Sequence, residues 1–105
     1  MFYTFTQNNS FGTFDVNDNV YHFVIIEAES ADEANDIGEH IGIYFDGVEN
    51  GIDCECCGDR WYRNYNGRGT EKPEIYGKSP SEYSHEYIIH YKDGRIERDG
   101  VIENV

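Results

Sequence analysis

A buried strand followed at once by a helix start signal limits the fold of this chain more than any other feature. Residues Val20–Glu29 contain the continuous apolar run Phe23–Ile26, which is typical of a central strand covered on both faces. Ser30 and Glu33 then form a capping box, which predicts a helix from Ala31 to about Ile41. Small and apolar residues recur on one face of this helix, at Ala31, Ala34, Ile37 and Ile41.

Strand and turn signals occur on both sides of this unit. Residues 2–6 and 86–92 are β-branched or aromatic and predict strands. Asp93-Gly94 predicts a two-residue hairpin turn into residues 95–98, and Asp99-Gly100 predicts a turn into a C-terminal edge at Val101 and Ile102. A loop is expected at residues 7–12, short strands at 13–16 and 61–65, and a strand or helix exit at 43–45.

The predicted elements favour an α+β fold in one domain, residues 1–105. One helix would pack on a small, mostly antiparallel sheet, with a cysteine-containing loop between the two halves of the chain. A length of 105 residues suits a single domain with one modest core. No apolar run is long enough to span a membrane, and the first residues lack the features of a signal peptide, so we expect a cytoplasmic protein.

Charge is distributed unevenly along the chain. The net charge is −13 at pH 7, residues 1–59 contain thirteen Asp and Glu, and no Lys or Arg occurs before Arg60. Residues 60–105 contain eight acids and eight bases, so the whole excess lies in the first 59 residues. Such a field repels phosphate and attracts cationic surfaces, so we do not expect binding to duplex nucleic acid. The alternative is that the acidity only keeps the protein soluble.

The outer face of the predicted helix is a candidate contact surface. Asp32 and Asp36 repel each other at i,i+4, and no base in this half offsets the repulsion. We therefore expect a cationic partner here, with a solvated helix face as the alternative. The residues assigned to partner binding are Asp32, Glu33, Asp36, Glu39, Asp46 and Glu49.

The cysteine block Cys54-Glu55-Cys56-Cys57-Gly58 contains one C-x-x-C-G step, which is half of a zinc knuckle. Cys54 and Cys57 are the expected Zn²⁺ ligands, although a structural site needs four. Free thiols and a disulfide are the alternatives. We do not expect catalytic thiols, because neighbouring carboxylates should raise their pKa. Further metal ligands would come from Cys56, His22, His40, His85, His90, Asp53 or Asp59.

The segment from Arg60 to Arg68 is the one stretch that is both basic and aromatic. Arg and aromatic side chains together can stack a base and hold a phosphate. The structural alternative is a strand whose aromatic residues enter the core and whose Arg residues pair with the acidic half. The candidate ligand-binding residues are Arg60, Trp61, Arg63, Tyr65 and Arg68.

Taken together, several motifs resemble an uncharacterised family of short, acidic proteins from tailed bacteriophages. The resemblance implies a protein that acts in the cytoplasm of an infected bacterium, and it carries no activity to transfer. The matching stretches are Phe2–Phe5 with Gln7–Ser10, Phe23–Ser30 with Asp32–Ala34, Tyr44–Gly47, Gly51–Cys54, Cys56–Trp61 and Tyr91–Gly94.

These observations favour a non-enzymatic protein that binds and inhibits a host protein through its acidic N-terminal half. By analogy with other small acidic phage proteins, it would imitate nucleic acid or act as a counter-defence factor. One alternative is a protein that sequesters a nucleotide or another small molecule through Arg60–Arg68. Another is an accessory protein stabilised by zinc. A homodimer is compatible with the sequence.

Overall fold

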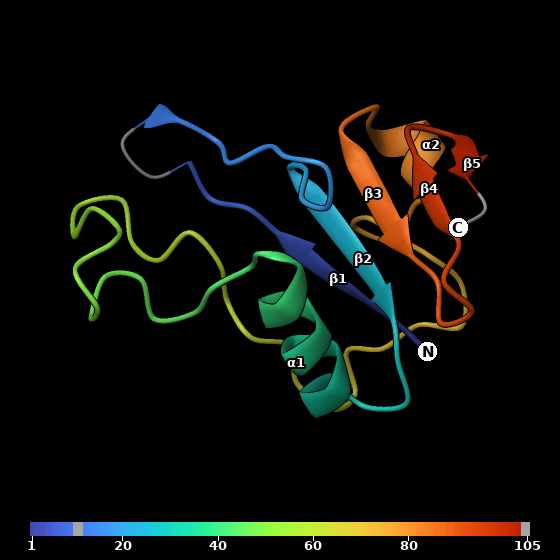
Figure 1. Ribbon diagram of the computed structural model, residues 1–105, viewed down its shortest axis with the longest axis horizontal. Helices are drawn as coiled ribbons and strands as arrows, with labels where there is room; N and C mark the ends of the chain where they lie inside the picture. Colours follow the sequence, from blue (N-terminus) through green and yellow to red (C-terminus); the bar gives the residue numbers. More distant parts are fainter. Residues whose placement is uncertain (10–11, 104–105) are drawn as a thin grey trace.

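A five-stranded sheet forms the centre of the protein (Figure 1). The computed structural model describes residues 1–9 and 12–103. The sheet has the strand order β1-β2-β3-β4-β5, and every neighbouring pair is antiparallel except β2–β3. The α+β prediction, with a mostly antiparallel sheet and one main helix, is therefore confirmed. The elements are β1 (Phe2–Thr6), β2 (Phe23–Glu27), α1 (Ala31–Ile41), α2 (Pro80–Tyr83), β3 (Tyr87–His90), β4 (Ile96–Arg98) and β5 (Val101–Glu103).

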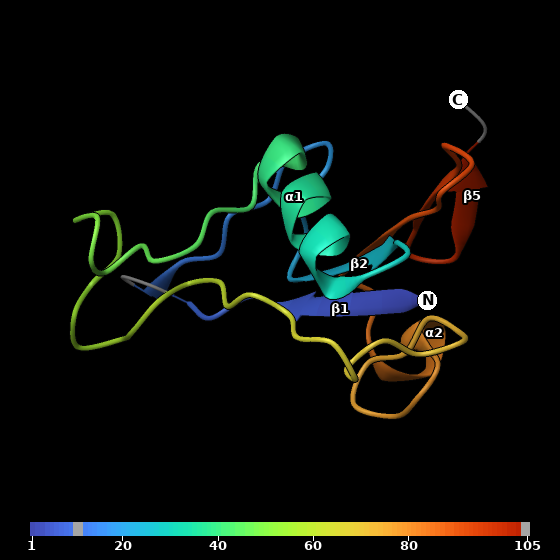
Figure 2. The same ribbon diagram turned by 90° about the horizontal axis from the view of Figure 1, so that it is seen from below.

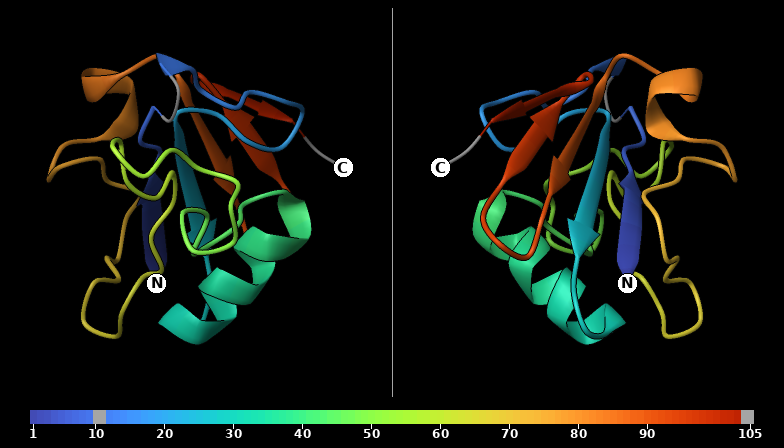
Figure 3. Two further views of the ribbon diagram at one scale, coloured as in Figure 1. Left: turned by 90° about the vertical axis from the view of Figure 1, so that its left-hand side faces the viewer. Right: turned by 90° about the vertical axis from the view of Figure 1, so that its right-hand side faces the viewer.

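Strand β2 is buried on both faces, as its apolar run predicts. Val24 and Ile26 pack in the core cluster beneath α1, whereas Ile25 packs in a second cluster with Ile75 and Tyr87. Helix α1 and the short helix α2 accordingly lie on opposite sides of the sheet (Figures 2 and 3). The alternation of β2 side chains between two cores explains why the run is continuous rather than alternating.

The sequence signals at both ends of α1 form the contacts that cap a helix. Ser30 Oγ accepts the Glu33 amide at 3.2 Å, and the Glu33 carboxylate accepts the Glu29 amide at 3.1 Å, one residue further back than in a standard capping box. Gly42 ends the helix at φ 118°, in the left-handed region. The buried face contains Ala31, Ala34 and Gly38, small residues that allow a close approach to the sheet.

The C-terminal strands are joined by the two predicted turns. Tyr91 and Arg95 close the β3–β4 hairpin around three residues rather than two, because Gly94 (φ 95°) adds a bulge after a tight turn. Asp99 and Gly100 have φ 49° and 91° and form the two-residue turn between β4 and β5.

Three of the weaker strand expectations are wrong, because residues 13–16, 43–45 and 61–65 are irregular. Buried side chains replace a strand ladder in the first segment: Gln7 bonds both main-chain groups of Asp15, and Arg60 donates to the Thr13 carbonyl. Asn35 does the same at Asn64, where its side-chain amide bonds both the N–H and the C=O. The loop expected at 7–12 lies partly outside the described residues, at 10–11.

The connection between the parallel strands β2 and β3 contains most of the chain. It runs from residue 28 to residue 86 and includes both helices and the cysteine block. Figure 1 shows its green and yellow part extending beyond the sheet, beside the blue segment that follows β1. The candidate functional residues are therefore mostly in loops outside the sheet, with those on α1 as the exception.

Candidate functional site

A buried arginine lies between the two loop regions that contain the candidate residues. Arg60 is 5% exposed and its Nη1 donates to Gln7 Oε1 at 2.9 Å and to the Thr13 carbonyl at 2.7 Å. Its Nε donates to the Tyr44 hydroxyl at 3.0 Å. The Asp53 carboxylate accepts the Arg60 amide at 2.8 Å and lies 3.8 Å from Nε. Arg60 is therefore a structural residue, as the structural alternative for this segment expected.

Asp53 completes this network and is buried too. Tyr44 donates its hydroxyl to Asp53 Oδ1 at 2.6 Å, and burial followed by this bond raises the pKa of Tyr44 to about 12. The Gly47 carbonyl accepts the Asp53 amide at 2.9 Å. Gly47 must lack a side chain, since a Cβ would lie 1.9 Å from Asp53 Oδ2. We call Gln7, Tyr44, Asp53 and Arg60 the Arg60 network.

The three cysteines lie together in an exposed turn. Their Sγ atoms are all within 4.8 Å of one another, and the Cys54 and Cys56 sulfurs are 2.6 Å apart. All three are free thiols, with Cys54 half-buried and the others exposed. The Cys57 and Gly58 amides donate to the Cys54 carbonyl at 3.2 and 3.1 Å, which folds Cys57 back toward Cys54. A group of three thiols that could hold a metal therefore includes Cys56 as well as the predicted Cys54 and Cys57.

The thiols do not ionise equally. A hydrogen bond with the Cys56 thiol, followed by the backbone amides of Cys56 and Cys57, lowers the pKa of Cys54. The same bond raises the pKa of Cys56, so the shared proton stays on Cys56. The expectation of a raised thiol pKa is wrong for Cys54, because direct hydrogen-bond donors outweigh more distant carboxylates.

The other residues considered as metal ligands lie elsewhere. Among the described residues, no His or Asp joins the cysteine group. Asp53 belongs to the Arg60 network, and Asp59 accepts the Val48 amide at 2.9 Å. His22 pairs with Glu86, while His40 and His90 contact the carbonyls of Asp36 and Asn19. His85 is exposed. The thiols would leave the fourth position on a tetrahedral metal to solvent.

The acidic residues assigned to partner binding divide into two groups. Asp32, Asp36 and Glu39 are exposed on α1 and make no ion pair with any residue in 1–9 or 12–103. Glu33 caps the helix start, and Asp46 pairs with Arg63 at 2.8 Å. Glu49 is exposed in the loop after α1. We call Asp32, Asp36 and Glu39 the α1 acidic stripe.

The candidate ligand-binding residues also divide. Trp61, at 1% exposed, belongs to the core with Arg60. Arg63 is exposed, pairs with Asp46 and lies over the Phe45 ring at 4.9 Å. Tyr65 and Arg68 are exposed, and the Arg68 guanidinium lies 6.0 Å from the Tyr65 ring centre.

The sequence gave no indication that Thr4, Thr6, Asn64 and Tyr76 lie beside Arg68. They surround a hollow along the free edge of β1. A pattern of alternating residues cannot reveal this neighbourhood, because it depends on how an irregular loop returns to a strand edge. The signal that could have been used is Tyr76-Gly77, a two-residue turn between residues 75 and 78.

A family model described as "Domain of unknown function (DUF7296)" matches residues 1–105. No curated protein and no solved structure matches the chain. In the part of the chain that the structure describes, no helix is both long and apolar enough to cross a membrane.

Gly47→Ala should destabilise the fold by about 2–4 kcal/mol, because the new methyl group displaces Asp53 from its buried partners. Urea unfolding followed by circular dichroism measures the change. Gly38→Ala is the matched control. Its Cβ would meet Ile43 Cδ1 at an ordinary 3.5 Å, so alanine should stabilise α1 by about 0.5–1 kcal/mol. Equal effects of the two substitutions would contradict this account of Gly47.

Cys54 should be alkylated at lower pH than Cys56, because its pKa is lowered and only the thiolate reacts. Iodoacetamide labelling across a pH series, with each cysteine quantified by peptide mass spectrometry, measures the order. Cys56→Ser should move the Cys54 profile to higher pH by removing its thiol donor. If Cys56 ionises first in the native protein, the assigned proton position is wrong.

Proposed function

The chain belongs to this family of unknown function, and from its own residues we propose that it is a non-enzymatic protein that binds a basic protein surface through the α1 acidic stripe. The observation that carries the proposal is that three exposed carboxylates, at i, i+4 and i+7, lie on one helix face without ion pairs among the described residues. Their mutual repulsion costs free energy in the isolated protein, and a cationic partner relieves it.

The nearest bases support this view because they are already engaged. Lys92 pairs with Glu29 next to the helix start, and Arg63 pairs with Asp46 beyond its end. The stripe between them keeps its charge. Exposed charges of this kind contribute to the rate of encounter and to the choice of partner more than to stability.

The resemblance to tailed-phage proteins supports a finer proposal about the partner. We propose a bacterial host protein with a basic surface, in the cytoplasm of an infected cell. Inhibition would follow if this surface normally binds nucleic acid, since the stripe would then compete with phosphates. Such a protein would be a nucleic-acid mimic or a counter-defence factor.

The triple variant D32N/D36N/E39Q should weaken binding to the partner by about tenfold, because three exposed charge contacts are lost. A pull-down from bacterial lysate at low salt identifies the partner by mass spectrometry, and titration with the purified partner gives the affinity. The control E55Q/E71Q/E82Q removes the same charge from exposed loop positions and should bind as the native protein does. Binding that does not change with salt, or that both triple variants weaken equally, would refute the proposal.

The cysteine group supports a second candidate role, that of a structural zinc knuckle. Thiolates are the ligands that zinc prefers in such sites, and Cys54 is already poised to lose its proton. Two sulfurs on one tetrahedral zinc stand roughly 3.8 Å apart, since each Zn–S bond is about 2.3 Å. Cys54 and Cys56, at 2.6 Å, would have to separate by side-chain rotation to bind together.

Native mass spectrometry of protein purified with zinc should detect one Zn²⁺, which a chelator removes. Cys54→Ser should abolish zinc binding because it removes the ionised ligand. His85→Gln is the control, because His85 lies outside the cysteine group and its loss should leave the metal in place. A mass equal to that of the bare chain would exclude the zinc role.

A further inference from the structure

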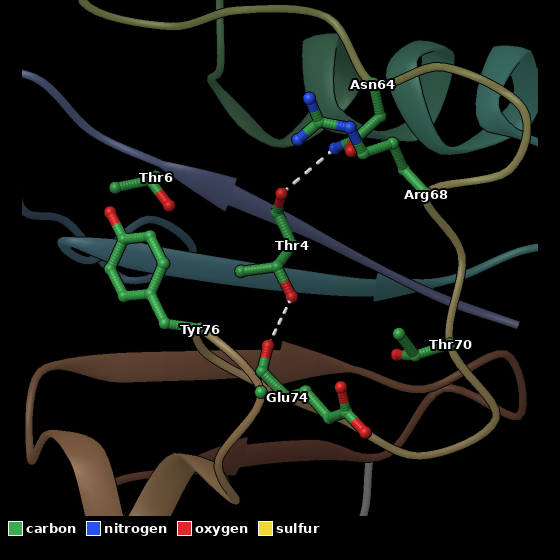
Figure 4. Close-up of a pocket in the computed structure, with 8 residues that line it drawn as sticks. Thr4, Thr6, Asn64, Arg68, Thr70, Glu74 and Tyr76 are labelled. Carbon is green, nitrogen blue, oxygen red and sulfur yellow. Dashed lines mark hydrogen bonds between the residues drawn. The ribbon is translucent and has the colours of Figure 1, made fainter.

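An open groove runs along the free edge of β1. It consists of two adjoining hollows of about 270 and 330 Å³, which share Thr4, Thr6, Asn64 and Arg68. Residues 62–65 form one wall and residues 74–77 the other. Figure 4 shows Asn64 and Arg68 on one side of Thr4, with Tyr76 on the other side, next to Thr6. Together the hollows reach the size of pockets that take small molecules.

The floor of the groove offers main-chain groups, but over a very short length. Residues 2, 4, 6 and 8 direct their N–H and C=O away from β2, because alternate residues do so in an antiparallel ladder. Phe2 already pairs with Thr70, and Asn8 donates to the Arg60 carbonyl. Asn64 donates to the Thr4 carbonyl at 3.1 Å. Only the Thr4 N–H and both groups of Thr6 stay open, too few for a partner strand but enough for the edge of one ring.

The walls of the groove contain the free positive charge of this acidic protein. Five of the eight bases form ion pairs, and the other three, Arg68, Lys72 and Lys78, make none among the described residues. Arg68 lines the groove, Lys72 lies between its lining residues Thr70 and Glu74, and Lys78 follows Gly77. Residues 62–80 contain four bases and two acids, whereas the whole chain has a net charge of −13. An anionic ligand is therefore favoured at this place and disfavoured elsewhere on the protein.

Tyr76 presents an aromatic ring at the groove from a strained position. Its φ is 50°, in the left-handed region, within a two-residue turn that ordinarily takes Asn, Asp or Gly. The side chain is 68% exposed although it contacts the rings of Phe23 and Tyr83 at their edges. Packing therefore does not account for a tyrosine here, and strain held at an exposed residue indicates a binding role. Tyr65, 65% exposed, offers a second ring beside Arg68.

We propose that this groove binds a mononucleotide, with the base beside Tyr76 and Thr6 and the phosphate at Arg68. Aromatic faces bind a base by stacking, open main-chain groups on the strand edge bond its polar atoms, and the unpaired guanidinium neutralises the phosphate. A long polyanion fits poorly, because the rest of the surface repels it. The site is separate from the α1 acidic stripe and does not depend on the function proposed for that stripe.

Isothermal titration calorimetry with AMP, GMP, CMP and UMP tests the proposal, with inorganic phosphate and a thymidine oligonucleotide as further ligands. We expect at least one mononucleotide to bind in the micromolar range, and Arg68→Ala and Tyr76→Asn to weaken it at least tenfold. Asn tolerates the left-handed turn, so Tyr76→Asn should keep the fold, which circular dichroism verifies. Arg95→Ala is the matched control, since Arg95 is also exposed and lies over a tyrosine ring, at 4.7 Å, outside the groove. It should bind as the native protein does.

The other outcomes each overturn the proposal. Phosphate that binds as tightly as the nucleotides means that no ring is recognised. An oligonucleotide that binds more tightly than any mononucleotide makes the ligand single-stranded nucleic acid. Failure of all four mononucleotides to bind, or equal binding to the Arg68→Ala protein, rules out the site. The D32N/D36N/E39Q variant should retain nucleotide binding, so the two proposed roles stand or fall separately.

Discussion

The ionic contact between Arg60 and Asp53 holds together the part of the protein that lies outside the sheet. Burying a guanidinium is costly unless nearly all of its donors find acceptors, and here they find Gln7, Thr13, Tyr44 and Asp53. These acceptors come from three separate stretches of chain that have no strand or helix to order them. Loss of any partner would leave a buried charge without compensation, so the whole loop region depends on this one contact.

The same contact places both candidate binding regions. Gly58 and the cysteines precede Arg60 directly, and the groove wall at Tyr62–Tyr65 follows it, so the network fixes the start of one loop and the end of the other. It also divides the charges of the chain by role. Arg60 and Asp53 stabilise the interior, whereas the helix acids and the bases around residues 68–78 stay at the surface with opposite signs. One small acidic protein thereby has a negative helix face and a positive groove.

Sequence reasoning succeeded where hydrogen bonds are local and failed where distant side chains take them. The burial of β2, the cap at Ser30 and the turn at Asp99-Gly100 follow from short-range rules, and the structure contains all three. Residues 13–16 and 61–65 have the composition of strands, yet their main-chain groups bond to Gln7, Arg60 and Asn35. No periodicity in the sequence identifies such partners. The inclusion of Cys56 in the thiol group likewise depends on a backbone turn that residue spacing alone does not define.

The single parallel pair in the sheet has a consequence for how the protein acquires its binding surfaces. β2 can pair with β3 only after the chain has closed a loop from residue 28 to residue 86. Closing so long a loop is entropically costly and gives the fold a high contact order, which slows folding. The hairpins formed by β3, β4 and β5 need no such closure. The helix face, the thiol turn and the groove all belong to the late-forming part, so recognition begins only once the two halves of the sheet have met.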